Sequence, residues 1–317
     1  MSSPRSTEQW PRAFRFINDI GRHRRDGYNR KEYGIKHPQL TYALPEDPLL
    51  KTVLIRSFER LGGVRKLEKM YARALYNYEA QGDLFASCLE QLRVELNYDE
   101  AQFAKIPQSG PVIFVANHPY GLLDGLTMCH LATLSRGDFR ILLHASLCRE
   151  ERIAPYALPV DFEETAEAVQ TNIETKRRSI ELLRAGGTIV IFPGGGISTS
   201  EGLFGPVADL EWKLFVTKLI QMTKATVVPI YFHGHNSRFF HIISQFSATV
   251  RLSLVVHEIY KKIGDPLQIE IGDPIPYEQV ANIKKRRELL QYLRTKIYEL
   301  GGCPEIALRE GRASESY

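Results

Sequence analysis

Long apolar runs and cysteine are both scarce in this 317-residue chain. No uninterrupted apolar stretch approaches the ~20 residues needed to cross a bilayer, and no charged start followed by an apolar core marks a secretory signal. The four cysteines, scattered without metal-site spacing, suit a reducing compartment and argue against a disulfide framework. We therefore expect a cytoplasmic protein without a transmembrane helix.

Several functional signatures are missing as well. The chain has no zinc-finger spacing, no aromatic RNA-binding signature and no basic recognition helix with its turn, so no nucleic-acid partner is predicted. It also lacks the Gly-x-Ser-x-Gly turn that carries the nucleophilic serine of α/β-hydrolases. Hydrophobic residues make up 44% and charged residues 25%, which is ordinary for a folded globular domain and does not indicate a disordered chain.

Positive charge is concentrated towards the N-terminus. The first 73 residues hold 16 Lys and Arg against 8 Asp and Glu, although the whole chain carries only +4. Basic segments of this kind are attracted to anionic surfaces. Because nucleic-acid signatures are absent, a lipid surface is the partner that this asymmetry favours.

From Pro111 onward, strand and helix patterns alternate, which is typical of an α/β domain. We expect a central, mostly parallel sheet flanked by helices, preceded by an N-terminal helical region. Strands are predicted near 112–116, 140–145, 187–192, 226–232 and 267–272. Helices are predicted near 122–135, 164–185, 209–224, 248–263 and 277–300, with Asp209 as an N-cap. The predicted parts are a basic segment 1–46, an amphipathic helical region 47–105, the main domain 106–300 and a polar tail 301–317.

The amphipathic region has two interpretations that do not exclude each other. Apolar residues recur at helical spacing over 49–61 and again over 64–75, beside lysines and arginines. Their apolar faces either cover the main domain or lie in a membrane interface with the basic groups towards lipid headgroups.

The most informative stretch is 112–125, in which a β-branched run ends at Asn117-His118-Pro119 and a new apolar helix begins near Leu122. Proline disfavours the α region for the preceding residue, so His118 is expected to be extended at the end of the strand. Asp124 follows six positions later, near the helix start. A histidine oriented by a carboxylate is suited to removing a proton from an alcohol or amine that attacks an acyl group.

Two further strand ends lead into polar or glycine-rich loops: 188–198, with Gly194-Gly195-Gly196, and 227–237, with His233. If the three strands are parallel neighbours, their loops meet in one crevice at the carboxyl edge of the sheet. Simpler interpretations remain open, because a histidine there is often structural and a glycine run can be a flexible connection.

These three blocks together resemble the glycerolipid and lysophospholipid acyltransferases, in the 1-acylglycerol-3-phosphate acyltransferase-like superfamily. His118 and Asp124 are separated by five residues instead of the usual four, in a His-Pro-x-Gly-x-x-Asp form similar to the hemolysin-like branch. The block 188–198 resembles Phe-Pro-Glu-Gly-Thr-Arg-Ser, but Gly194 replaces the glutamate and Ile197 the arginine.

The resemblance implies a peripheral membrane acyltransferase on the cytoplasmic face of a membrane. It implies acyl-CoA or acyl carrier protein as the co-substrate, a lysophospholipid or lyso-aminolipid acceptor, and no resident cofactor. It assigns general-base catalysis to His118 and Asp124. The predicted substrate-binding residues are Asn117, Gly121, Phe192, Pro193, Gly194, Gly195, Gly196, Ser198 and His233.

Other functions stay open at this point. The same pair could activate water, which would make a thioesterase or lipid esterase, and the altered glycine block would also suit an inactive lipid-binding membrane-surface protein. The loss of the acid and the cation at Gly194 and Ile197 makes a tight site for a free phosphate dianion harder to build. His233 and His235 share a face of one strand end and could hold a metal together with His118 and Asp124. Histidines on a strand are usually satisfied by hydrogen bonds, so no metal is predicted.

Overall fold

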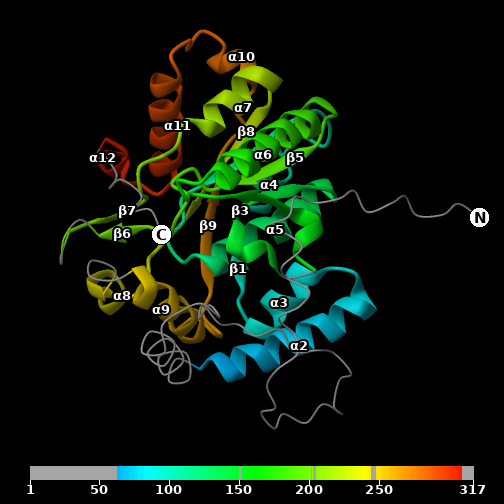
Figure 1. The fold of residues 1–317 in the computed structure, drawn as a ribbon, viewed down its shortest axis with the longest axis vertical. Coiled ribbons are helices and arrows are strands. Elements are labelled where there is room, and N and C mark those ends of the chain that lie inside the picture. Colours follow the sequence, from blue (N-terminus) through cyan, green and yellow to red (C-terminus); the bar gives the residue numbers. More distant parts are fainter. Residues whose placement is uncertain (1–62, 150–151, 201, 203–204, 244–247, 309–317) are drawn as a thin grey trace, which may run out of the picture.

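The computed structural model describes residues 63–149, 152–200, 202, 205–243 and 248–308 (Figure 1). The predicted segment 1–46 and the helix over 49–61 lie outside these residues, as does most of the polar tail. The predicted domain boundaries therefore stay predictions.

The centre of the fold is a seven-stranded sheet in the order β1-β9-β8-β2-β5-β3-β4. The strands are β1 (Leu96–Asn97), β2 (Val112–Ala116), β3 (Arg140–His144), β4 (Ala157–Val160), β5 (Thr188–Ile191), β8 (Thr226–Phe232) and β9 (Leu267–Ile271). All neighbouring pairs are parallel except β8 and β9, which are antiparallel. The prediction of a mostly parallel sheet is confirmed.

Strand β2 is the middle strand of the sheet and is buried along its whole length. Its side chains alternate between the two faces, so Phe114 belongs to one hydrophobic cluster while Ile113 and Val115 belong to the other. A strand covered on both faces reads as a continuous apolar run, which is what Val-Ile-Phe-Val-Ala supplies.

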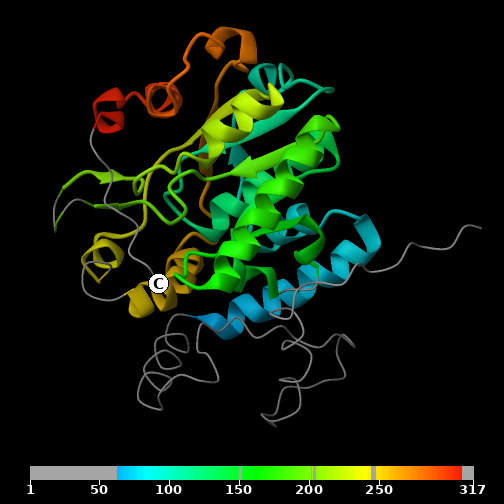
Figure 2. The ribbon, with the colours of Figure 1, turned by 45° about the horizontal axis from the view of Figure 1, so that its top comes forward.

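Helices cover both faces of the sheet, giving a three-layer arrangement. Helices α2 (Val64–Gln81), α3 (Leu84–Leu92), α5 (Leu122–Arg136) and α9 (Ala248–Lys261) contribute to the cluster on one face. Helices α6 (Ala166–Arg184), α7 (Phe215–Thr223) and α11 (Arg286–Leu300) contribute to the cluster on the other. In Figure 2 the blue α2 and the orange α11 lie at opposite ends of the molecule.

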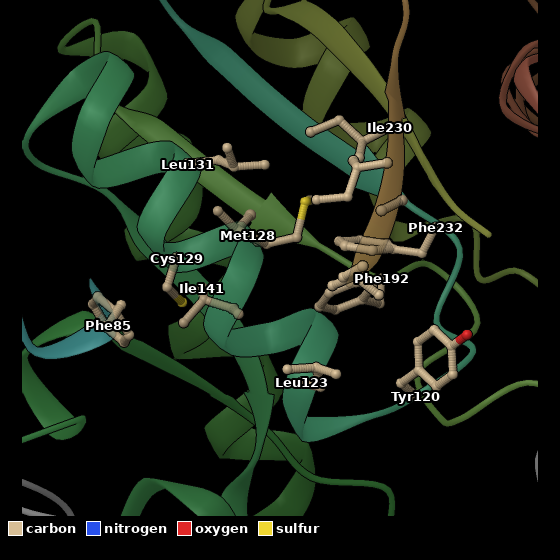
Figure 3. Packing of buried hydrophobic residues seen from close by; sticks show 14 of the residues in the cluster. Phe85, Tyr120, Leu123, Met128, Cys129, Leu131, Ile141, Phe192, Ile230 and Phe232 are labelled. Carbon is tan, nitrogen blue, oxygen red and sulfur yellow. The ribbon is translucent and has the colours of Figure 1, made fainter. Parts of the chain in front are cut away.

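The first face is packed by side chains that reach from α5 to the sheet. Figure 3 shows Met128 of α5 extending towards Ile230 and Phe232 of β8, with Phe192 beside them. Met128, Ile230 and Phe232 are all fully buried. Burying a side chain of this size stabilises the fold by about 1.5–3 kcal/mol, so helix α5 is held firmly against the strand ends.

Short elements connect these layers. They are α4 (Glu100–Phe103), α8 (Arg238–Ile243), α10 (Tyr277–Val280), α12 (Pro304–Ala307), the 3-10 helices η3 (Ala145–Arg149) and η4 (Ala154–Tyr156), and a hairpin of β6 (Thr199–Ser200) with β7 (Val207–Ala208).

Two helix predictions are wrong in their extent. The helix predicted over 209–224 begins only at Phe215, because residues 209–214, which follow the β6–β7 hairpin, form an irregular stretch. Asp209 directly follows β7 and is therefore not an N-cap. The helix predicted over 277–300 is two helices, α10 and α11, separated by a turn.

Helix α2 shows how the amphipathic region is used. Its apolar residues Leu67, Ala74 and Leu75 are buried within the protein, while Arg65 and Arg73 are exposed. The apolar face of this helix therefore covers the domain. Within the described ranges, none of the helices is both long enough and apolar enough to cross a membrane.

Candidate active site

The three sequence blocks meet at one edge of the sheet. Strand β2 pairs in parallel with β5 on one side and with β8 on the other, so the loops that follow all three strands leave the sheet side by side. Ligands of open α/β sheets bind at the carboxyl edge of the strands. The topology therefore brings the loop of His118, the glycine loop and the loop of His233 together.

His118 and Asp124 form a close pair. The Nδ1 atom of His118 is 3.1 Å from Oδ2 of Asp124, and the Asp124 side chain is fully buried while the His118 side chain is 17% exposed. The distance is within the range of an ion pair, but the contact does not meet the geometry of a hydrogen bond. With Nδ1 facing the carboxylate, Nε2 is the nitrogen left to meet a substrate.

The turn between the two residues holds the carboxylate in place. Oδ2 of Asp124 accepts hydrogen bonds from the backbone N–H groups of Tyr120 (2.7 Å) and Gly121 (2.9 Å). Asp124 is the third residue of α5, where a carboxylate that accepts from the N-cap backbone stabilises the first turn of a helix. One oxygen thus serves the helix and the imidazole together.

Gly121 is required by both backbone conformation and space. Its φ is +77°, and an added Cβ would lie 2.6 Å from Cδ1 of Ile197. A larger residue would be strained in this conformation and would push against the neighbouring loop. Ile197, which stands where the resembled family has arginine, therefore fills the space beside the turn with an apolar side chain.

Burial and a stacked aromatic ring define the environment of the His118–Asp124 pair. Burial raises the pKa of the Asp124 carboxyl, and the contact with His118 and the two backbone N–H groups oppose this only in part. The His118 ring stacks on Phe192 with 3.9 Å between ring centroids. Phe192 directly follows β5, so the first residue of the glycine block packs against one face of the imidazole ring.

The glycine loop itself is tightly turned. The N–H of Gly195 donates to the carbonyl of Phe192 (2.9 Å), and Gly195 has a φ of +69°. The carbonyl of Pro193 accepts from the N–H of Lys213 (2.9 Å), while Gly194 is buried. Within the described part of the chain, the N–H groups of Gly194 and Gly196 donate to no other backbone group of the loops and turns.

Two side chains tie the loop after β2 to strand β8. Asn117 donates through Nδ2 to the carbonyl of Phe232 (2.9 Å) and accepts from its N–H through Oδ1 (2.7 Å). The Tyr120 hydroxyl donates to the carbonyl of His233 (2.9 Å). Burial raises the pKa of Tyr120 to about 12, so the hydroxyl keeps its proton and remains a donor at neutral pH.

The two histidines after β8, His233 and His235, contact residues other than His118 and Asp124. The His233 ring lies 3.6 Å from Glu270 and contacts the ring of Tyr231 edge-on, while His235 Nδ1 lies 2.6 Å from the carbonyl of Asn236. Over the described ranges, no cluster of three or more His, Cys, Asp or Glu side chains is placed to bind a metal ion.

Sequence reasoning missed the role of Asp209. This residue is 2% exposed, and Oδ1 accepts from the backbone N–H of His118 (3.0 Å) and from the hydroxyl of Ser198. Ser198 is thus engaged with protein groups, and its predicted contact with substrate stays a prediction. The only available signal was an acidic residue close after the glycine block, which also fits a helix cap.

Similarity to known proteins adds to this geometry. A family model described as Acyltransferase matches residues 69–305. A lyso-glycine lipid O-acyltransferase of Phocaeicola vulgatus is 28% identical over 230 residues, covering 69% of this chain and 77% of the relative. A lyso-glycine lipid O-acyltransferase of Bacteroides thetaiotaomicron is 25% identical over 229 residues, covering 69% and 79%.

Among solved structures, the 1-acyl-sn-glycerophosphate acyltransferase of Thermotoga maritima is similar, with a TM-score of 0.45 and 15% identity. The match covers 83% of this chain and 99% of that one.

Proposed function

The chain belongs to this acyltransferase family, and from that premise we propose that it transfers a fatty acyl group from a thioester to the hydroxyl of a lysolipid. The single observation that carries the mechanism is the 3.1 Å contact between His118 and the buried Asp124 at the carboxyl edge of the sheet. A base oriented by a carboxylate is what an acyl-accepting hydroxyl needs.

In the proposed reaction, Nε2 of His118 removes the proton of the acceptor hydroxyl as its oxygen attacks the thioester carbonyl. Asp124 stabilises the imidazolium that forms. The bond between carbon and sulfur then breaks, and the thiolate leaves with the proton from His118. The backbone N–H groups of Gly194 and Gly196 are the proposed donors to the carbonyl oxygen while it carries negative charge. No covalent acyl-enzyme is required.

For the acceptor, we propose a lyso-aminolipid in preference to a phosphorylated glycerol. Two relatives are named as lyso-glycine lipid O-acyltransferases. The glycine block also supports this choice, because Gly194 and Ile197 supply neither the acid nor the cation of the common family sequence. A phosphate dianion is recognised best by a charged, bidentate donor such as arginine, whereas a headgroup of lower charge does not need one.

The proposed setting is the cytoplasmic face of a membrane, with the protein bound at the surface. The exposed Arg65 and Arg73 of α2 continue the positive charge of the N-terminal residues. Each basic group near an anionic surface contributes about 1 kcal/mol. Co-flotation with anionic vesicles, lost in high salt and absent with zwitterionic vesicles, is the expected result. Equal binding to both vesicle types would count against an electrostatic attachment.

The activity is tested by incubating the protein with labelled acyl-CoA, or with acyl carrier protein, and a panel of lysolipids, with mass spectrometry of the products. Acylated lyso-aminolipid should form, and His118→Ala should reduce turnover by about 10²–10⁴-fold with the fold intact. Release of free fatty acid irrespective of the lysolipid would instead indicate a thioesterase. Vesicle binding without any acyl turnover would indicate an inactive lipid-binding protein.

A further inference from the structure

The backbone of His118 is fixed from both sides by groups outside its own strand and turn. Its N–H donates to Oδ1 of Asp209 (3.0 Å), and its carbonyl accepts from the N–H of Ser198 (2.8 Å). The hydroxyl of Ser198 donates to the same Oδ1 atom (2.5 Å). The residue that carries the imidazole is therefore joined to the glycine block through Asp209 and Ser198.

Asp209 is buried, and both oxygens of its carboxylate accept hydrogen bonds. Its second oxygen, Oδ2, accepts from the indole Nε1–H of Trp212 (2.9 Å), and its own N–H donates to the hydroxyl of Tyr298 on α11 (2.9 Å). Asp209 and Trp212 are 2% and 3% exposed. A buried carboxylate is tolerated when donors surround it, and here a hydroxyl and two N–H groups do so.

From this geometry we propose that Asp209 is a positioning residue for the acyl transfer reaction, acting through the backbone of His118. The inference rests on the proposed function, since it assigns Asp209 the task of holding the catalytic histidine in place. Asp209 contacts no reacting atom. It sets the distance between His118 and the glycine loop, and a displacement of about 1 Å in such a site lowers the rate by roughly 10²-fold.

The hydrogen bonds of the Asp209 carboxylate can be tested with asparagine, which has nearly the same shape. In Asp209→Asn only one side-chain oxygen remains, so the amide nitrogen must face either the N–H of His118 or the indole N–H of Trp212. Two donors then oppose each other, and one buried N–H group is left without an acceptor. Replacing Trp212 by Phe removes the indole donor, which lets the remaining oxygen face His118 and Ser198 again.

The experiment compares wild type, Asp209→Asn, Trp212→Phe and the double variant by kcat, KM and thermal midpoint. Asp209→Asn should lower kcat by about 10- to 100-fold while KM changes less than about threefold. The double variant should recover kcat at least about fivefold over Asp209→Asn, even though its thermal midpoint stays low. A purely structural role predicts instead that activity follows the thermal midpoint, and that result would overturn the proposal.

A readout independent of turnover separates this inference from the proposed function. Diethyl pyrocarbonate modification of His118, followed by peptide mass spectrometry, should be at least about threefold faster in Asp209→Asn and return towards wild type in the double variant. His233, whose ring contacts Glu270 and Tyr231, is the internal reference. An unchanged modification rate overturns the inference whether or not a lysolipid is acylated.

Ser198→Ala keeps the inference testable if Asp209→Asn does not fold. The substitution removes one donor to Asp209 and leaves the other contacts in place. If Ser198 acts with Asp209, kcat should fall while KM stays constant. A rise in KM at unchanged kcat would show that the hydroxyl contacts substrate and would contradict the proposed positioning role.

Discussion

Replacing Asp124 by asparagine tests the charge of the carboxylate with little change of shape. The amide oxygen can take the position of Oδ2 and still accept from the N–H groups of Tyr120 and Gly121, so the helix start should persist. What disappears is the attraction between the carboxylate and the imidazolium of His118. At an effective dielectric constant near 20, charges about 4 Å apart interact by about 4 kcal/mol.

This energy corresponds to roughly 10³ in rate, and the two backbone N–H groups already neutralise part of the charge, so a loss of about 10²–10³ in kcat is expected. The assay is the initial rate of acyl transfer from labelled acyl-CoA at saturating lysolipid. If Asp124→Asn turns over within about threefold of wild type, the carboxylate does not stabilise the imidazolium and the dyad reasoning fails.

Thermal stability provides the control, and the direction of its pH dependence follows from the pKa of Asp124. Burial raises the pKa of Asp124, so this group contributes stability that is present at low pH and is lost as pH rises through the raised pKa. Asparagine does not ionise. The thermal midpoint of Asp124→Asn relative to wild type should therefore increase from acidic to neutral pH. Asp124→Ala should be less stable than Asp124→Asn, because both backbone N–H groups lose their acceptor.

Three further predictions concern residues around the site. Gly121→Ala should destabilise the protein by about 1–3 kcal/mol in denaturant unfolding, because φ is positive at this position and the added Cβ would press against Ile197. The double variant with Ile197→Ala should recover the part of the lost stability that is due to this contact, and no recovery would refute the contact. Asn117→Ala should lower stability by about 1–3 kcal/mol, because the N–H and carbonyl of Phe232 lose their partners, and a variant as stable as wild type would contradict this. Burial lowers the pKa of His241 to about 4, so the free energy of unfolding of wild type should fall by up to about 3 kcal/mol as pH falls from 6.5 towards 4. His241→Phe should show a shallower decline, and parallel curves of unfolding free energy against pH for the two proteins would refute the assignment.

Much of the fold could be predicted because the sheet is covered on both faces. A continuous apolar strand such as 112–116 or 226–232 stands out from the polar turns around it, and both strands have the predicted bounds. The short strand β4 and the β6–β7 hairpin were not predicted. Two- to four-residue strands contain too few alternations to produce a pattern, and their position depends on tertiary contacts.

The candidate site was predictable to the extent that it follows strand ends. His118 and Asp124 were identified from one continuous stretch, and the pairing of β2 with β5 and β8 brings the other two loops beside it. Asp209 could not be identified in this way. Its partners His118 and Tyr298 are 91 and 89 residues away in the chain, and no local pattern records such contacts. An acidic side chain near an expected helix start is also an ordinary cap.

The place of Asp124 in helix α5 explains how a longer interval between the two residues is compatible with the same pairing. The carboxylate belongs to the rigid first turn of the helix, whereas the additional residue of the His-to-Asp interval can be absorbed in the loop that ends at Gly121, whose φ is +77°. Alignment of this chain with relatives that have four intervening residues should therefore open its gap before Leu122. Deleting a residue after Leu122 would instead rotate the carboxylate by about 100° around the helix axis, away from the imidazole.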